Sequence, residues 1–460
     1  MDRVDHIVAL VLENRSFDHL LGDSGRSGRL PVDGGSSDLV NVDLNGRSVA
    51  MSPVSFAITP DLPHDFESVA ISLMESNGGF VRADQFDHGG DPLARPDRVM
   101  SYYVHGTLPV THRLAEAYTV CDAWFASVPA GTWPNRLFLV AGSSAGSVRN
   151  TVSPVLYDLP TVFDRLPSPD WVVYNDQIPN VALIRALALE WARNRVTGDH
   201  FRGVRQFEED CANDQLPGLS FIEPIYLGKN ANDGHPPRDI TASEHLIARV
   251  YRALRRSPAW TRSLLLIFYD EHGGFFDHVP PPVDVPSPGT GDYGFEFSRL
   301  GVRVPCLIVS PFAPAGVAWR PPQAAFADHT SLIATVLRKF EREPLTARDA
   351  AAADVWSALT LDSPRTDDET TIADLETWLD QQRINATRQF GPLPDSGLDL
   401  RTGREMAAAI VAEAGPLPSQ PGFRTAMTTN VPAATGGEWR DLPLDRAIVD
   451  LASNILALPM

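Results

Sequence analysis

The sequence predicts an α/β fold, in which a doubly wound sheet carries helices on both faces. Short runs of apolar residues, at 7–12, 263–269 and 304–312, are typical of strands that are buried on both faces of a parallel sheet. Between these runs lie stretches with apolar residues at helical spacing. Apolar strands that alternate with amphipathic helices indicate a sheet covered by helices.

The first third of the chain supplies the first strand and its insertions. Residues 7–12 form the strand, and residues 23–57, rich in Gly, Ser and Asp, predict a loop or small hairpin inserted after it. Residues 114–125 begin as a helix and end as a buried strand. A further helix is expected to begin at Thr132 as its N-cap, with Pro134 in the first turn.

The middle of the chain continues the alternation. Residues 171–176 predict a strand and residues 184–195 a helix. Residues 241–255 predict a helix that opens with a capping box formed by Thr241 and Glu244. The apolar stripe of this helix consists of Leu246, Ile247, Val250, Tyr251 and Leu254.

The buried strands at 263–269 and 304–312 complete the sheet, and a helix is expected from residue 329 to 340. We therefore expect one large domain over residues 1–345. Residues 346–460 are richer in Pro and Ala and contain one acidic helical stretch near 368–381. They are expected to form a C-terminal appendage that packs on the domain or covers it.

Composition excludes some classes of function. The chain has 460 residues, of which 43% are hydrophobic and 21% charged, as is usual for a globular protein. Its net charge of −19 disfavours nucleic-acid binding and non-specific attraction to an anionic membrane. A local basic pocket for phosphate remains compatible with this charge. The sequence leaves the oligomeric state open.

Targeting and redox signals are few. No run of 18 apolar residues occurs, so we expect no transmembrane segment. The first apolar run is short and begins among charged residues, which does not fit a signal peptide. The chain as written is therefore expected to be cytoplasmic, or else the mature form of a secreted protein. Cys121, Cys211 and Cys306 are too scattered for a disulfide framework or a cysteine zinc site.

Two pairs of polar residues come directly after buried strands. Glu13 and Asn14 follow the first strand, and Asp270 and Glu271 follow the strand at 263–269. Open α/β sheets bind ligands at the carboxyl ends of their strands, and the glycines at 273–274 allow the turn that would make both members of a pair converge. Carboxylate and amide oxygens suit a hard cation, such as Ca, Mn or Mg, although iron is also compatible.

Two other residue types point to phosphate chemistry. A hydroxyl at the N-terminus of a helix, as expected for Thr132, meets free amides and the positive end of the dipole, although the same residue could simply cap the helix. Histidines in loops beside the strands could ligate a metal, stabilise phosphoryl oxygens or protonate a leaving group. These histidines are His64, His235, His272, His278 and His329.

The chain resembles the bacterial phosphoesterase family that includes phosphatidylcholine-type phospholipases C and an acid phosphatase, with related non-specific phospholipases C in plants. Nine segments carry the resemblance in the family's order and cover most of residues 4–340. They are IVALVLENRSFDHLLG, MSYYVHGTLPVTHRLAEAYTVCDAWFASV, GTWPNRLF, TVFDRL, LPGLSFIEP, NDGHPPRDI, SPAWTRSLLLIFYDEHGGFFDHVPPP, FSRLGVRVPCLIVSPF and DHTSL.

The resemblance implies an alkaline-phosphatase-like sheet and a role for each site residue. Thr132 matches the family's hydroxyl nucleophile, and His64 and His235 match histidines that contact the phosphoryl group. Four residues match the binding site for one divalent metal ion: Glu13, Asn14, Asp270 and Glu271. The resemblance assigns no role to His272, His278 or His329, and Asp328 with His329 is similar to a ligand pair of two-metal relatives.

We expect the protein to be a hydrolase of ester bonds, and more narrowly a metal-dependent, phospholipase C-like enzyme. Its expected substrate is a phosphodiester, such as a phosphocholine lipid, which it would cleave through a phosphothreonine intermediate. One alternative is an acid phosphomonoesterase for soluble phosphates, and another is a non-catalytic protein that binds phosphate or lipid head groups. A lipid substrate needs an apolar approach to the site. The candidates to supply it are Phe80, Trp124, Trp133, Phe275 and Phe276, although Trp124 and Phe275 could equally be core residues.

Overall fold

The computed structural model describes residues 1–54, 61–87, 96–150, 156–197, 199–228, 230–238, 240–322 and 326–367. In this part of the chain a sheet of eight strands forms the centre, in the order β13-β6-β12-β11-β1-β10-β8-β9. Its strands are β1 (His6–Leu12), β6 (Thr119–Cys121), β8 (Trp171–Tyr174), β9 (Phe201–Arg202), β10 (Leu219–Ile222), β11 (Ser263–Tyr269), β12 (Cys306–Val309) and β13 (Val317–Trp319).

Strand β1 lies in the middle of the sheet and runs parallel to both neighbours, β10 and β11. Leu12, the last residue of β1, pairs with Tyr269, the last residue of β11. The polar pairs that follow the two strands therefore leave the sheet at the same edge. Strand β12 runs antiparallel to β11 and β6, which an apolar run alone does not predict.

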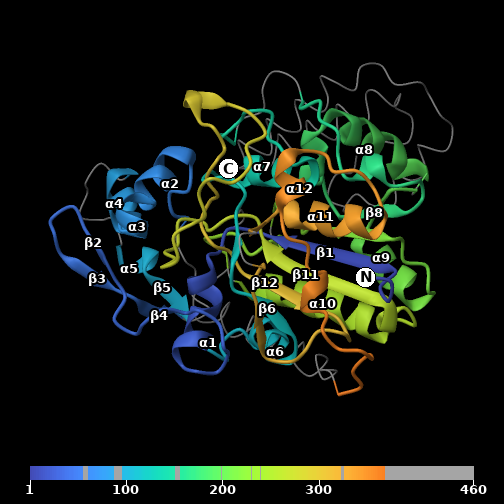
Figure 1. The fold of residues 1–460 in the computed structure, drawn as a ribbon, viewed down its shortest axis with the longest axis horizontal. Coiled ribbons are helices and arrows are strands. Elements are labelled where there is room, and N and C mark those ends of the chain that lie inside the picture. The colour runs from blue at the N-terminus through green and yellow to red at the C-terminus, as the bar shows by residue number, and fades with distance from the viewer. Residues whose placement is uncertain are drawn as a thin grey trace, which may run out of the picture.

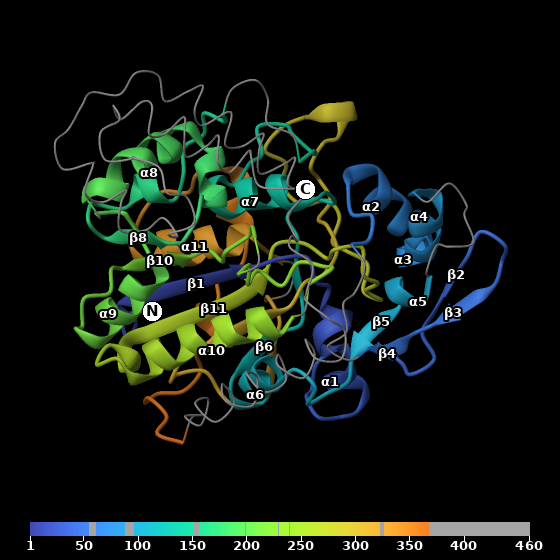
Figure 2. The ribbon, with the colours of Figure 1, turned by 180° about the vertical axis from the view of Figure 1, so that it is seen from behind.

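Helices cover both faces of the sheet (Figures 1 and 2). One face carries α7 (Thr132–Ala141), α8 (Arg185–Thr197), α11 (Thr330–Lys339) and α12 (Ala347–Ala351). The other face carries α6 (Pro109–Ala117), α9 (Val204–Ala212) and α10 (Thr241–Arg256). The expected α/β class, with a sheet between helices, is confirmed.

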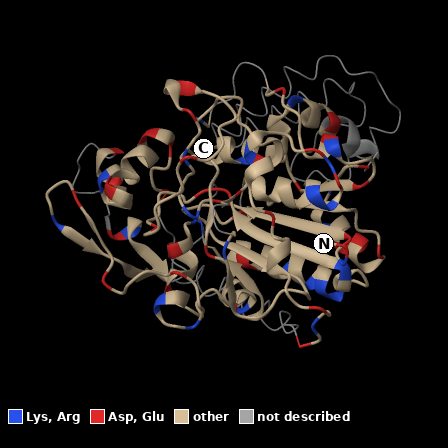
Figure 3. Cartoon of the chain, in the orientation of Figure 1, with Lys and Arg blue, Asp and Glu red and all other residues tan. Residues whose placement is uncertain are grey.

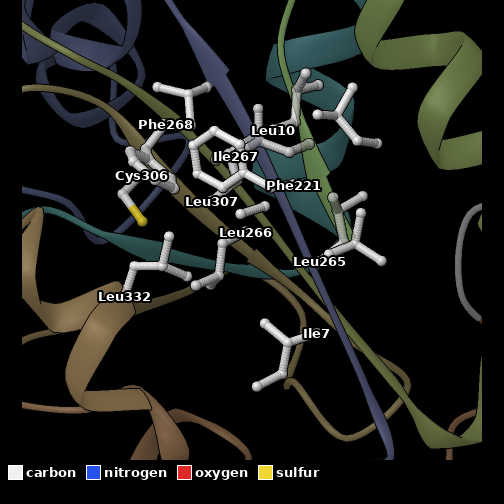
Figure 4. Packing of buried hydrophobic residues seen from close by; sticks show 14 of the residues in the cluster. Ile7, Leu10, Phe221, Leu265, Leu266, Ile267, Phe268, Cys306, Leu307 and Leu332 are labelled. Carbon is white, nitrogen blue, oxygen red and sulfur yellow. The ribbon is translucent and has the colours of Figure 1, made fainter. Parts of the chain in front are cut away.

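The core lies between the sheet and these helices. Figure 4 shows Leu265, Ile267 and Phe268 of β11 packed among side chains of β1, β10, β12 and α11. Every residue of β11 is buried, as expected for a strand covered on both faces. Burial of each large apolar side chain contributes about 1.5–3 kcal/mol, so this central strand is strongly held.

A lobe of smaller elements projects beyond the carboxyl edge of the sheet (Figure 1, left). The expected hairpin within 23–57 is confirmed, because two of its strands pair antiparallel. The elements of the lobe are α1 (Asp23–Arg26), β2 (Val40–Val42), β3 (Ser48–Ala50), β4 (Ser52–Val54), α2 (Phe66–Ser72), α3 (Met74–Asn77), α4 (Phe80–Asp87), α5 (Pro96–Val99) and β5 (Ser101–Tyr103). Two short strands outside the lobe, β7 (Trp124–Phe125) and β14 (Ala327–Asp328), pair with each other.

The described residues beyond 345 pack on the main domain. Thr346 and Asp349 form a capping box at the start of α12. The side chain of Arg348 is fully buried and pairs with Asp328 at 3.2 Å. The acidic stretch expected as a helix near 368–381 lies outside the described residues. Among those described, no helix is both long and apolar enough to cross a bilayer.

Two expected helix caps are wrong. The N-cap of α7 is Gly131, not Thr132, which lies inside the helix at its first position. Helix α10 begins after Ile240 without a side-chain cap, so Thr241 and Glu244 form no capping box there. Glu244 instead turns to the start of α6, where its carboxylate accepts the backbone N–H of Val110 at 2.8 Å and that of Thr111.

Glu244 thus stabilises a helix other than its own, and this contact can be tested. We expect Glu244→Ala to lower the free energy of unfolding by about 2–3 kcal/mol, because it leaves buried N–H groups of α6 without an acceptor. Glu208→Ala is the matched control, since Glu208 pairs with Arg249 at the surface, and we expect it to cost less than about 1 kcal/mol. Denaturant unfolding measures both; equal losses would contradict the capping role.

Candidate active site

The two polar pairs meet at the edge of the sheet. The backbone N–H groups of Asn14 and Glu271 both donate to Oδ1 of Asp270, at 3.1 and 2.8 Å. Figure 3 shows acidic segments gathered in the loops between this edge and the lobe. Glu13, Asn14, Asp270 and Glu271 are all fully buried, as predicted for a site rather than for solvated strand ends.

Backbone geometry makes this convergence possible. Asn14 has a φ of +61°, and Gly273, which follows the second pair, has a φ of +62°. A Cβ on Gly273 would lie 2.3 Å from the carbonyl oxygen of Asn14, so only glycine lets the two loops approach this closely. The expected turn at the glycines is confirmed.

Arg136 holds the acidic group together, and it was not among the predicted site residues. It follows Thr132 by four residues and therefore lies on the same face of α7. Its Nε donates to Asp270 at 3.1 Å, and its Nη2 donates to Oε1 of Glu13 at 3.3 Å. A charged residue within a wholly buried helix was the signal that could have identified it.

A second donor fixes Glu13 on the same side. The Nδ2 of Asn180 also donates to Oε1 of Glu13, at 3.3 Å. The other oxygen, Oε2, accepts no hydrogen bond from the described residues, and the same holds for Oε1 of Glu271. A buried carboxylate oxygen without a hydrogen bond lowers the stability of the folded protein. A ligand bound by these two oxygens would remove that cost.

The charges of the group favour a cation as that ligand. Burial, together with the charge of Asp270, raises the pKa of Glu13 well above its usual value. Burial also raises the pKa of Asp270 to about 6, even though Arg136 opposes this rise. Burial and mutual repulsion thus disfavour the ionised form of these two carboxyl groups, and a bound cation would favour it. Carboxylate and amide oxygens are ligands that a hard divalent cation prefers.

The described residues also contain tighter groups of potential ligands. In two groups of three, the ligand atoms all lie within 4.8 Å of one another: Asp61 with His64 and His235, and Asp18 with Asp277 and His278. The carboxylates of Glu13, Asp270 and Glu271 are not part of such a group among the described residues.

Thr132 lies beside the acidic group, at the N-terminus of α7. Its side chain is buried, and its hydroxyl lies 3.5 Å from Oδ1 of Asn14. The hydroxyl therefore faces the predicted metal ligands rather than the backbone amides that an N-cap would bind. The positive end of the helix dipole stabilises negative charge at this position.

His64 reaches the same place from the lobe. Its Nδ1 donates to the carbonyl oxygen of Leu62 at 2.6 Å, which leaves Nε2 facing Asn14 at 3.3 Å and Glu271 at 3.7 Å. Burial alone would lower the pKa of His64, but the carboxylates of Glu271 and Asp61 outweigh it and raise this pKa to about 9. Without a metal ion, His64 is thus held as a cation.

His235 completes the set from the loop after β10. Its ring centroid lies 5.9 Å from that of His64. Its backbone N–H donates to Asp233 at 3.0 Å, and its Nδ1 hydrogen-bonds the carbonyl oxygen of Pro236. The structure therefore brings the seven predicted site residues to one edge of the sheet, although their chemical roles stay predictions.

The other loop histidines have structural partners. Nδ1 of His272 lies 3.1 Å from Glu271, and Nε2 of His329 bonds the carbonyl oxygen of Asp270. Asp328, the neighbour of His329, pairs with the guanidinium of Arg348 at 3.2 Å. These side chains thus support the loops of the site, and Asp328 already has a positive partner.

His278 belongs to a separate buried network behind the site. Its Nδ1 lies 2.7 Å from Asp18, which also binds Arg303 at 3.0 Å. Arg303 binds Asp277 at 3.0 Å as well. Because Arg303 binds both carboxylates and His278 binds one of them, we interpret this group as a structural ion cluster and not as a metal site.

The expected apolar approach is wrong. Phe80, Trp124, Trp133, Phe275 and Phe276 are all 5% exposed or less and pack inside the protein. A groove of about 900 Å³ instead reaches His64 and Gly131, the neighbour of Thr132, from the side of the lobe. Sequence patterns did not separate core aromatics from those on a rim, because both types stand in apolar stretches.

Buried oxygens suited to a cation, a hydroxyl and two histidines at the edge of an α/β sheet define a hydrolase-like site. The model of the Phosphoesterase family matches residues 4–342, and the chain belongs to that family.

Relatives of the chain include plant and bacterial phospholipases C. Non-specific phospholipase C4 of Arabidopsis thaliana is 34% identical over 400 residues, which cover 80% of this chain and 74% of the relative. Non-specific phospholipase C6 of the same plant is 36% identical over 396 residues, which cover 80% and 75%. Phospholipase C B of Mycobacterium tuberculosis is 27% identical over 498 residues, which cover 94% and 90%.

Among solved structures, the phosphonate monoester hydrolase of Agrobacterium radiobacter resembles the chain weakly. The TM-score is 0.34 and the identity 12%, over 79% of each chain.

Proposed function

We propose that the protein is a metal-dependent phosphodiester hydrolase of phospholipase C type. The observation that carries this proposal is the Thr132 hydroxyl, which is buried at a helix N-terminus and faces Asn14 within the acidic group. Membership of the Phosphoesterase family and the names of the relatives support the same reaction.

The residues fit one divalent cation. Glu13, Asn14, Asp270 and Glu271 would hold it. Glu13 and Glu271 each offer an oxygen that accepts no hydrogen bond from the described residues, and the side-chain oxygens of Asn14 and Asp270 lie in the same group. When bound, the ion would neutralise charge on the phosphoryl oxygens and favour ionisation of the Thr132 hydroxyl. Oxygen ligation favours Ca, Mn or Mg.

The protein's own residues supply the remaining steps. Oγ1 of Thr132 attacks phosphorus, the bond to the leaving alcohol breaks, and phosphothreonine forms. One of the two histidines, His64 or His235, gives the leaving oxygen a proton and, now neutral, takes a proton from the water that hydrolyses the intermediate. The other histidine takes the proton of the Thr132 hydroxyl in the first step and returns it to Oγ1 in the second. Arg136 and Asn180 keep Glu13 in place during both steps.

A substrate panel with metal-stripped protein tests this function. Phosphatidylcholine, glycerophosphocholine and p-nitrophenyl phosphate are offered with Ca, Mn, Mg, Zn or Fe added back singly. We expect phosphocholine to be released from a diester only with an added ion, with activity at least about 100-fold above the stripped protein, since such an ion contributes several kcal/mol.

The other outcomes identify the rival functions. Release of phosphate from the monoester alone would make the protein a phosphomonoesterase. Stoichiometric binding of a head group without turnover in any metal would make it a binding protein. Equal activity with and without metal would contradict the role of the four oxygen ligands.

A further inference from the structure

A third carboxylate leaves the sheet at the same edge as the two polar pairs. Glu223 directly follows β10, whose last residue, Ile222, pairs with Leu10 of the neighbouring parallel strand β1. Its side chain is fully buried, as that of Glu13 is. Unlike Glu13, however, Glu223 accepts hydrogen bonds on both carboxylate oxygens, so it is not free to hold an ion.

One set of these hydrogen bonds fixes a short 3₁₀ helix, Asn180–Leu183. Glu223 accepts the backbone N–H of Asn180 on Oε2 at 2.5 Å and that of Val181 on Oε1 at 3.0 Å. The helix has no side-chain cap from its own preceding residue, so Glu223 takes that part. Because Asn180 donates from Nδ2 to Oε1 of Glu13 at 3.3 Å, the backbone that Glu223 holds determines where this amide meets Glu13.

A second contact leads from Glu223 towards Arg136. The hydroxyl of Tyr226 donates to Oε2 of Glu223 at 2.6 Å. The guanidinium of Arg136 lies over the ring of Tyr226, 5.6 Å from its centroid, at a distance typical of a cation–π contact. Arg136 donates to the same oxygen of Glu13 that Asn180 binds, so both supports of Glu13 lead back to Glu223.

This arrangement decides which oxygen of Glu13 is left for a ligand. Arg136 and Asn180 both bind Oε1, whereas Oε2 accepts no hydrogen bond from the described residues. If either donor moved, the carboxylate could turn, and the free oxygen would no longer be held in one place. A ligand oxygen that is fixed before the ion arrives binds it more tightly than one that must first be ordered.

We infer that Glu223 is a positioning residue for the cation site, which acts through Asn180 and Arg136 and touches neither the ion nor the substrate. The inference rests on the proposed function, because it concerns the cation that Glu13 would help to hold. Groups that orient a metal ligand are worth about 10- to 100-fold in metal affinity.

Glu223→Gln tests the inference by ion binding, without turnover. Glutamine has nearly the same shape, but its NH₂ group accepts no hydrogen bond, so at least one of the three donors to Glu223 loses its acceptor. We expect the affinity of metal-stripped protein for Mn²⁺, measured by calorimetry, to fall about 10- to 100-fold. An excess of the activating ion should restore most of the activity on glycerophosphocholine, with KM for this substrate unchanged.

Glu244→Gln is the matched control. The carboxylate of Glu244 is also buried and also accepts two backbone N–H groups and one hydroxyl, from Val110 and Thr111. These donors belong to α6 and not to the supports of Glu13. We expect both variants to lose stability in denaturant unfolding, but only Glu223→Gln to bind Mn²⁺ more weakly.

A double substitution tests the route of the effect. Asn180→Ala removes the Nδ2 donor to Glu13 and should itself weaken Mn²⁺ binding. Combined with Glu223→Gln, it should weaken binding by less than the product of the two single effects, because both act on the same contact. A full product of the two effects would contradict the route through Asn180.

Tyr226→Phe is a milder variant that remains informative if Glu223→Gln does not fold. It keeps the ring beside Arg136 and removes only the hydroxyl that donates to Glu223. We expect a smaller fall in Mn²⁺ affinity than in Glu223→Gln, and an unchanged affinity would count against the inference.

Two further results would overturn the positioning role. One is a wild-type affinity for Mn²⁺ in Glu223→Gln, and the other is an equal fall in Glu244→Gln, which would indicate a general effect of lost stability. Failure of the proposed function looks different. In that case Mn²⁺ would bind, and bind more weakly in Glu223→Gln, yet no diester would be hydrolysed.

Discussion

Thr132→Ala should abolish turnover, with a loss of at least about 1,000-fold, as is usual when an enzyme loses its nucleophile. The structure gives the reason: the Thr132 hydroxyl is buried and faces Asn14 at 3.5 Å. No other residue of the first turn of α7 carries a hydroxyl that could replace it. Phosphocholine release from a short-chain diester measures the loss.

The variant must remain folded for this result to be informative. Thr132 is the first residue of α7 and not its N-cap, so its loss should leave the helix intact. We expect the unfolding temperature to stay within a few degrees and metal content to be retained through the four other ligands. Thr132→Ser keeps a hydroxyl and should retain measurable activity.

A trapping experiment distinguishes a nucleophile from a mere metal ligand. If Thr132 attacks phosphorus, acid quenching during turnover of the phosphocholine diester should leave a phosphocholine group esterified to this residue, detectable by mass spectrometry in the wild type and absent in Thr132→Ala. Two results would remove Thr132 from the mechanism. One is full activity of Thr132→Ala, and the other is wild-type protein that turns over at its normal rate without any modified Thr132.

The main features of the fold follow from the sequence because they depend on short-range patterns. The apolar runs at 7–12 and 263–269 determine the central strands, and parallel pairing then places Glu13 beside Asp270. The capping of α10 was mispredicted for the opposite reason. Glu244 has the spacing of a capping box, yet its partner lies on α6, 133 residues away along the chain.

Local patterns predict the site where residues directly follow strands, whereas the roles of Thr132, His64 and His235 were predicted from the family resemblance. Arg136 and Asn180 hold Glu13 from α7 and from a distant loop, and no local pattern links them. The groove likewise depends on the lobe, whose residues 61–87 have no distinct motif. Contacts between segments far apart in sequence decide both features.

Arg303→Met should be the most destabilising of the substitutions considered, with a loss of about 3–5 kcal/mol in the free energy of unfolding. Arg303 is fully buried and binds Asp18 and Asp277, each at 3.0 Å. Its removal leaves the buried carboxylate of Asp277 without its guanidinium and that of Asp18 with His278 alone. Denaturant unfolding measures the effect.

Arg320→Met is the matched control, because Arg320 also pairs with a buried aspartate, Asp122, at 2.7 Å. The side chain of Arg320 is 58% exposed, so water can replace the ion pair, and we expect a loss of about 1 kcal/mol or less. Arg303→Lys should not rescue stability, since one ammonium cannot reproduce the separate bonds to both carboxylates. Similar losses in Arg303→Met and Arg320→Met would contradict the structural role of the cluster.

The pH dependence of the loss tests its cause. Burial and the charge of Asp18 together raise the pKa of Asp277 to about 7, although Arg303 opposes both effects. Without Arg303 the pKa of Asp277 should rise further. When the pKa of a carboxyl group is higher in the folded than in the unfolded state, the protein becomes less stable as pH increases between these two pKa values. The deficit of Arg303→Met should therefore be larger at pH 8 than at pH 5. A deficit that is independent of pH would indicate lost packing against Phe17, whose ring lies 4.2 Å from the guanidinium, and not an unpaired charge.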